Sequence, residues 1–237
     1  MGTEIKPVSG MDRRLCSSGN RGALVLTIGL LILLLIWDFS GLDLAVSRNL
    51  ADTSGFWLRQ HWLFSKVLHD SLRLLSVLIA ALLLLNVWRP LIRGIRFWRR
   101  IDWFVTCLSV AFFIAALKRF SATSCPWHLA EFGGQARYVS HWVVTLNDGG
   151  PGHCFPSGHA VSEFAFLAGW LVLRDHRPRL ARLWLVSVLM AGLLAGTAQV
   201  VRGAHYVSHV LWSAWLCWVF TLMTLFALSR VRRHFDS

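Results

Sequence analysis

Six long apolar segments constrain what this chain can fold into more than any other feature. A helix needs about 20 mostly apolar residues to cross the hydrocarbon core of a bilayer. Stretches close to that length cover residues 23–46, 72–89, 101–118, 158–174, 182–201 and 207–228. We therefore predict an all-α fold, in which residues 1–237 form a single integral membrane domain with a bundle of six transmembrane helices.

The composition favours the same fold class. Hydrophobic residues make up 55% of the chain and charged residues only 15%, which excludes an ordinary water-soluble domain. The formal net charge of +12 would suit a nucleic-acid-binding protein, but the basic residues cluster between the apolar segments. Several of the 13 Trp lie near segment ends, where their rings favour the membrane interface. We expect contacts with membrane lipids and no nucleic-acid partner.

The basic residues also predict which helix ends face the cytoplasm. They gather in a tail over residues 1–22, between spans 2 and 3, between spans 4 and 5, and after the last span. With six spans these regions share one side, so both termini are expected to be cytoplasmic. The loop 119–157 and the turn 202–206 are then expected on the outer face. The first apolar core also resembles a signal peptide, but without a convincing small-residue cleavage site we expect an uncleaved anchor.

Histidines, basic residues and small residues meet at the predicted outer helix ends. Lys118 ends one span, Ser157, Gly158 and His159 open the next, and the turn Arg202–His205 links the last two. A helix N-terminus offers free backbone N–H groups and a positive dipole end, which together bind an anion. Two histidines allow one to attack phosphorus while the other protonates the departing oxygen, without a metal or another cofactor. At the edge of the hydrocarbon, this pattern predicts a site for the phosphate of a lipid.

These residues resemble three motifs of the type 2 phosphatidic acid phosphatase (PAP2) superfamily. The motifs are Lys-x6-Arg-Pro, Pro-Ser-Gly-His and Ser-Arg-x5-His-x3-Asp. The middle motif is complete at residues 156–159, Lys118 and Pro126 match the first, and His205 matches the histidine of the third. The resemblance covers residues 118–212, and the six-helix arrangement extends it to most of the chain.

The resemblance implies a role for each matching residue. His205 would attack phosphorus and form a phosphohistidine, and His159 would be the general acid. Lys118, Ser157 and the backbone of Gly158 would hold the phosphate of a phosphorylated lipid substrate. The superfamily implies a membrane lipid phosphatase or phosphotransferase that acts on a phosphomonoester or diphosphate. It also implies a bacterial inner membrane, with the active site facing the periplasm.

The chain departs from the motifs at three places. Cys125 replaces the arginine of the first motif, residues 198–199 are Ala-Gln in place of Ser-Arg, and His209 replaces the final aspartate. Arg202 lies close to one helical turn beyond residue 199, so we expect it to supply the missing guanidinium. The missing carboxylate normally orients the nucleophilic histidine, and we assign that role to Glu163, one turn inside the fourth span.

Two further pairs of small residues carry structural predictions. Cys125 and Cys154 both fall in outer segments, so in an oxidising compartment we expect a disulfide that closes the loop between them. Gly192 and Gly196 form a Gly-x3-Gly pair in the fifth span, which predicts close packing against neighbouring helices.

Several alternatives stay open at this point. His205 and His209 have the spacing of metal ligands on a helix, but no carboxylate or cysteine cluster at ligand spacing accompanies them, so we expect no metal. A catalytically inactive lipid-phosphate-binding protein would need the same pocket. An anion transporter is disfavoured, because the chain shows no internal repeat and no proline inside a span. The residues do not choose among lipid phosphates, and they do not give the oligomeric state.

Overall fold

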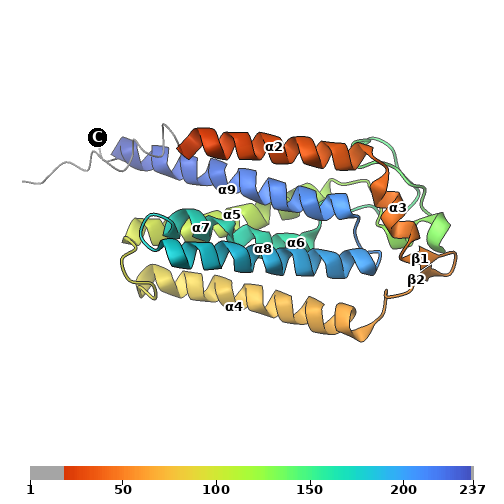
Figure 1. Ribbon diagram of the computed structural model, residues 1–237, viewed down its shortest axis with the longest axis horizontal. Helices are drawn as coiled ribbons and strands as arrows, with labels where there is room; N and C mark the ends of the chain where they lie inside the picture. The colour runs from red at the N-terminus through yellow and green to blue at the C-terminus, as the bar shows by residue number, and fades with distance from the viewer. Residues whose placement is uncertain (1–18, 236–237) are drawn as a thin grey trace, which may run out of the picture.

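The computed structural model describes residues 19–235, which are mostly helical and contain almost no sheet. Within this range, five helices are long and apolar enough to cross a membrane, which indicates a multi-pass membrane protein. They are α2 (Gly19–Phe39), the π-helical turn η1 (Leu63–Leu68) continued by α4 (His69–Trp88), α5 (Phe97–Arg119), α8 (Pro178–Val201) and α9 (Val207–Phe235). Figure 1 shows α2 along α9 on one side of the bundle and α4 on the other.

The remaining apolar segment forms a shorter helix at the centre of the bundle. It runs from Gly158 to Leu173 as α6 (Gly158–Phe164), the 3-10 turn η4 (Ala165–Leu167) and α7 (Ala168–Leu173). Nearly all of its side chains are buried, and it packs against α5, α8 and α9. In the described part of the chain, six apolar segments are therefore helical, but only five reach the length of a bilayer span.

Glycines in α8 let the central helix approach closely. A Cβ at Gly192 would meet the ring of Phe164 in α6, and a Cβ at Gly196 would meet Val210 in α9. Both glycines face neighbouring helices rather than lipid, so their predicted role in close packing is confirmed.

The first predicted span, residues 23–46, is wrong at its C-terminal end. Helix α2 stops at Phe39, the chain turns at Gly41 with φ +73°, and a separate helix α3 (Leu42–Arg48) follows. The reason is Asp43, whose buried carboxylate accepts hydrogen bonds from Trp37 Nε1 (3.0 Å) and from the backbone N–H of Ser208 (2.9 Å). The carboxylate thus binds a free N–H at the start of α9 instead of lying within an apolar span.

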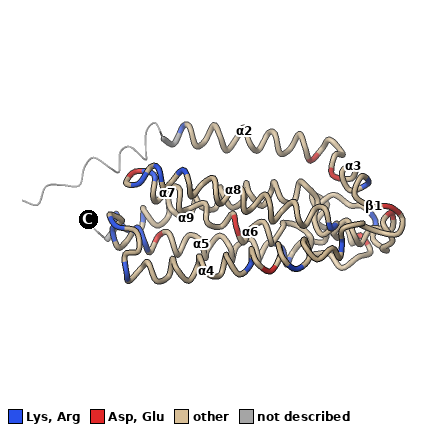
Figure 2. The backbone as a smooth tube through the Cα atoms, turned by 60° about the horizontal axis from the view of Figure 1, so that its bottom comes forward, with Lys and Arg blue, Asp and Glu red and all other residues tan. Residues whose placement is uncertain are grey.

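The two ends of the bundle differ in charge. Lys and Arg concentrate in the loops near the C-terminus, whereas the opposite end carries both signs (Figure 2). That opposite end, which we call the site end, holds α3, the hairpin of β1 (Ala51–Asp52) and β2 (Gly55–Phe56), the loop 120–157 and the turn 202–206. Short 3-10 helices η2 (Pro126–His128) and η3 (Ala130–Phe132) lie in that loop. Of the predicted tail 1–22, residues 1–18 lie outside the described residues.

Candidate active site

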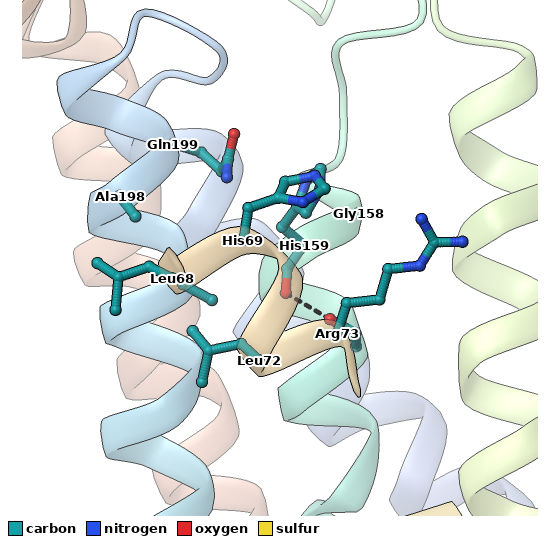
Figure 3. Close-up of a pocket in the computed structure, with 10 residues that line it drawn as sticks. Leu68, His69, Leu72, Arg73, Gly158, His159, Ala198 and Gln199 are labelled. Carbon is teal, nitrogen blue, oxygen red and sulfur yellow. Dashed lines mark hydrogen bonds between the residues drawn. The ribbon is translucent and has the colours of Figure 1, made fainter. Parts of the chain in front are cut away.

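A pocket of about 190 Å³ opens at the site end between η1–α4, α6 and α8. Its polar wall contains both charged and neutral hydrogen-bonding side chains, and its apolar wall comes from α4 and α8 (Figure 3). The lining residues are Leu68, His69, Leu72, Arg73, Gly158, His159, Ser162, Ala195, Ala198 and Gln199. Two predicted site residues, Gly158 and His159, therefore line one cavity.

His159 is the second residue of α6, which directs its ring into this pocket. Its Nε2 lies 2.6 Å from Nε2 of His69, and its Nδ1 is buried without a hydrogen-bond partner within residues 19–235. Ser162 Oγ donates to the backbone oxygen of His159 at 2.7 Å, a contact drawn in Figure 3. One ring nitrogen of His159 is thus held by protein while the other remains free.

The predicted phosphate-binding residues surround the start of α6. Lys118, near the end of α5, directs Nζ to the backbone oxygen of Pro156 at 3.4 Å. A Cβ at Gly158 would lie 3.8 Å from that ammonium, so the charge stands beside the helix N-terminus. Ser157 precedes the helix, and its buried Oγ has no partner among the described residues. A cation, a hydroxyl without a partner in the described part of the chain and the first N–H groups of a helix thus converge, as an anion site requires.

His205 reaches the same region from the turn between α8 and α9. Gly203 adopts a left-handed conformation (φ +75°) against the ring of Phe56, which permits this tight turn. His205 is buried and does not line the pocket. Burial lowers the pKa of His205 well below its usual value, and nearby Lys118, His209 and His159 lower it further. The ring is therefore neutral at physiological pH, as a nucleophilic imidazole must be.

Comparison with known proteins agrees with this geometry. A family model of the PAP2 superfamily matches residues 101–233, a range that runs from the first turn of α5 to the last turn of α9 and includes most of the cluster just described. The chain belongs to the PAP2 superfamily. This membership implies phosphatase-type activity, because proteins of the superfamily generally hydrolyse phosphate esters. Searches of curated proteins and of solved structures find no match to the chain.

Two cysteines join the first and second PAP2 motifs. Cys125 and Cys154 form a disulfide with Cα atoms 5.1 Å apart, and Sγ of Cys154 lies 3.5 Å from Nδ1 of His205. The two sulfurs and His205 are close enough to surround a metal ion, but both sulfurs are joined to each other and offer no thiolate. At the position where the superfamily motif has arginine, this chain has Cys125. Its disulfide to Cys154 connects the start of the loop 120–157 to the residues just before α6.

His209 stands in place of the PAP2 aspartate and makes a different contact. Its Nδ1 lies 3.1 Å from the backbone oxygen of Cys154, and its ring packs edge-on against those of His141 and Phe155. His141 in turn lies 3.3 Å from the carboxylate of Asp38, at the end of α2. His209 therefore holds the segment that precedes α6, and no carboxylate bonds to His205 among the described residues.

Glu163 does not take the place of that aspartate. Its buried carboxylate accepts a hydrogen bond from Ser76 Oγ of α4 at 2.5 Å, and no contact with His205 is found within residues 19–235. The reason is its position one turn below His159 on the side of α6 that faces α4. The predicted orienting role of Glu163 therefore requires correction: the residue links two helices.

Arg202 remains close to the pocket, as expected, but its guanidinium is already engaged. It donates from Nε to the backbone oxygen of Arg59 at 3.0 Å and from an Nη to Gln199 Oε1 at 3.3 Å. Burial lowers the pKa of Arg202, and the neighbouring Arg59 lowers it further. Through Gln199, which lines the pocket, Arg202 contributes positive charge at its rim.

The sequence interpretation missed three polar residues at the start of α4. His69 and Asp70 lie before the apolar segment predicted to begin at residue 72, and Arg73 lies at its edge, so the sequence analysis assigns them no role in the site. Figure 3 shows His69 beside His159, with Gln199 on one side of this pair and Arg73 on the other. The available signal was the titratable cluster within the first turn of a span.

Proposed function

We propose that the protein is a membrane lipid phosphatase or phosphotransferase that acts on a phosphomonoester or diphosphate carried by a lipid. One observation carries the proposal: the pocket combines a wall of histidine, arginine and glutamine side chains with an apolar wall of Leu68, Leu72, Ala195 and Ala198. A lipid phosphate needs both surfaces, because its tail stays in the hydrocarbon while its charge requires donors and cations. The phosphate would enter this pocket between α4 and α8.

The proposed reaction begins when the phosphate binds beside Lys118, Ser157 and the backbone of Gly158. His205 then attacks phosphorus, and the bond from phosphorus to the lipid oxygen breaks. The proton that this oxygen needs comes from His159. Water, or an acceptor hydroxyl in a transferase, next attacks phosphorus, and the bond from phosphorus to the nitrogen of His205 breaks. His159 takes up the proton that the attacking hydroxyl group loses. This cycle restores both rings and needs no metal.

His205 is buried in the absence of substrate, so the proposal requires a local movement. The turn 202–206 has to shift, or the pocket has to deepen, before the phosphoryl group can reach the ring. A movement of such a turn does not require the bundle to unfold.

We further propose a bacterial inner membrane with the pocket on the periplasmic face. The concentration of Lys and Arg at the end near the C-terminus supports this orientation, because such loops favour the cytoplasm. The Cys125–Cys154 disulfide lies at the site end, where an oxidising compartment would maintain it. Cysteine accessibility to a membrane-impermeant reagent in intact cells, at single cysteines placed in the loops 89–96 and 133–150, tests the orientation.

Phosphate release tests the activity directly. The purified protein in detergent with EDTA is given a panel of lipid phosphates, and released phosphate is compared with that from His205→Ala. We expect metal-independent release by the wild type that is lost in the variant. Binding of a lipid phosphate without release would instead identify an inactive lipid-phosphate-binding protein, for which the altered third motif already gives a reason.

A further inference from the structure

A chain of three titratable side chains links the surface of α4 to the proposed general acid. Asp70 Oδ1 lies 2.8 Å from Nδ1 of His69, and Nε2 of His69 lies 2.6 Å from Nε2 of His159. The two imidazole rings are 4.4 Å apart between centroids. His69 and Asp70 belong to α4, whereas His159 belongs to α6, so the contact exists only in the folded bundle.

The distance between the two Nε2 atoms dictates how protons are placed. Two N–H groups facing each other would repel, and so would two bare nitrogens, so one ring must donate to the other. Asp70 is an acceptor when ionised, which fixes the proton of His69 on Nδ1. The Nε2 of a neutral His69 is then bare, and it accepts the Nε2–H of His159.

The same assignment identifies the reactive atom of His159. With Nε2–H held by His69, the remaining nitrogen, Nδ1, is the one that gains and loses a proton. This Nδ1 is buried and has no hydrogen-bond partner among the described residues, and His159 lines the pocket. Its proton is therefore not committed to any protein group and can be given to a substrate oxygen.

We propose that His69 and Asp70 form a positioning pair that holds His159 in the Nε2–H form and makes Nδ1 its acid–base atom. The inference rests on the proposed function, since it assigns a role within the same site. In the first step the Nδ1–H bond of doubly protonated His159 breaks and an O–H bond forms on the departing lipid oxygen. His159 keeps its Nε2–H bond to His69 throughout. In the second step Nδ1 takes a proton from the attacking water, which restores the starting state.

The charges around His159 explain why a carboxylate is needed. Arg73 from α4, Lys118 from the end of α5 and Arg202 after α8 all act on His159 with positive charge, and His205 lies in the turn beyond. Glu163 on α6 is bonded to Ser76. Within residues 19–235, Asp70 is the acidic side chain in contact with the His69–His159 pair, so its negative charge opposes these positive charges.

His69 and Asp70 differ in burial, which predicts that replacing them reduces kcat to different degrees. The side chain of His69 is 24% exposed and that of Asp70 is 71% exposed, so solvent screens the charge of Asp70. His69→Ala should reduce kcat by about 10-fold to 100-fold, less than the loss of the acid itself, about 100-fold to 10,000-fold. Asp70→Asn should reduce kcat less than His69→Ala does. It should also move the alkaline limb of the plot of kcat against pH to lower pH, by about half a unit. KM should change little in both.

Steady-state kinetics with a short-chain lipid phosphate tests the proposal. His69→Gln should recover much of the activity lost in His69→Ala, because the amide oxygen can accept the Nε2–H of His159. In a His159→Ala background, His69→Ala should have no further effect on kcat. His61→Ala is the matched control, since His61 is exposed at the same end of the bundle and does not line the pocket. Additive effects of the two alanine variants, or a change in KM alone, would overturn the proposal.

A second measurement does not depend on turnover. Diethyl pyrocarbonate reacts with neutral imidazole, and mass spectrometry follows its attachment to His159 against pH. In Asp70→Asn the midpoint of this modification should move to lower pH by about half a unit, with the His61 adduct unchanged. A shift in a protein that releases no phosphate would retain the inference and reject the proposed function. If the midpoint of His159 modification is the same in the wild type and in Asp70→Asn, the inference is rejected, whether or not the protein releases phosphate.

Discussion

Sγ of Cys154 lies 3.5 Å from Nδ1 of His205, so the disulfide to Cys125 rests against the proposed nucleophile. The bridge has a sequence separation of 29 residues, and it ties the outer loop to the residues that open α6. A covalent link at this position stabilises the fold and also fixes the ring that it touches.

Loss of this bridge should therefore lower both stability and turnover. Closing a loop of this length stabilises a protein by about 2–4 kcal/mol. We expect Cys125→Ser to lower the melting temperature in detergent and to reduce kcat, because His205 loses a fixed neighbour. On electrophoresis, reduction should change the mobility of the wild type and leave that of Cys125→Ser unchanged.

Cys107→Ser provides the control, since Cys107 is a free, buried cysteine in α5. The electrophoretic mobility of Cys107→Ser should still change on reduction, as that of the wild type does. Identical mobility of the oxidised and reduced wild type would refute the bridge.

The sequence predicted the helices better than their ends. Apolar segments of bilayer length are visible without a fold, because hydrocarbon thickness alone sets their length. Their ends depend on which polar residues find partners, and such partners are distant in sequence. Asp43 shows this: its acceptor role for Ser208, 165 residues away, explains why α2 ends early.

The residues of the candidate site also fall into two groups: those that the sequence reveals and those that only the fold reveals. Lys118, Ser157, Gly158 and His159 could be found because each falls in a short motif whose chemistry is local. His69 lies 90 residues from His159 and belongs to no such motif, so only the packing of α4 on α6 reveals the contact. Tertiary proximity, rather than local pattern, decides this part of the site.

The protonation of His205 should be visible in the pH dependence of the reaction. Burial disfavours the imidazolium form, so the pKa of His205 falls well below its usual value and the neutral ring persists as the pH decreases. We expect the acidic limb of kcat/KM to lie below about pH 6.5, the value of an unperturbed histidine. Phosphate release between pH 4.5 and 9, corrected for the ionisation of the substrate measured by ³¹P NMR, gives this limb.

Lys118→Gln supplies the internal comparison. Since the ammonium of Lys118 helps to lower the pKa of His205, its removal should move the acidic limb to higher pH, in addition to weakening phosphate binding. An acidic limb at or above pH 6.5 in the wild type would show that His205 is not the ring that must be neutral.

Glu163 should matter for stability more than for chemistry. Its carboxylate accepts from Ser76 Oγ between α6 and α4, so Glu163→Gln can keep this bond through its amide oxygen. We expect Glu163→Gln to retain turnover and melting temperature near those of the wild type. Glu163→Leu removes the bond between the two helices, while the hydroxyl of Ser76 can still donate to the backbone oxygen of Leu72 at 3.0 Å. The expected cost is about 0.5–1.5 kcal/mol, which should lower the melting temperature.

Two outcomes would contradict this assignment. One is a large loss of kcat in Glu163→Gln with an unchanged melting temperature, which would return Glu163 to a direct role at the site. The other is an unaltered melting temperature in both Glu163→Leu and Ser76→Ala.

Close packing behind the pocket should couple stability to activity. A Cβ at Gly192 of α8 would meet the ring of Phe164, which lies on the same helix, α6, as His159. Gly192→Ala should therefore displace α6, lower the unfolding free energy by about 1–3 kcal/mol, and reduce kcat. Gly29→Ala is the matched variant, because no atom of the described residues lies within 4 Å of a Cβ at Gly29 of α2. It should leave kcat unchanged and stabilise its helix slightly, since alanine is the better helix former. Equal melting temperatures for the two variants would mean that the contact between α8 and α6 is loose, and that the position of His159 does not depend on it.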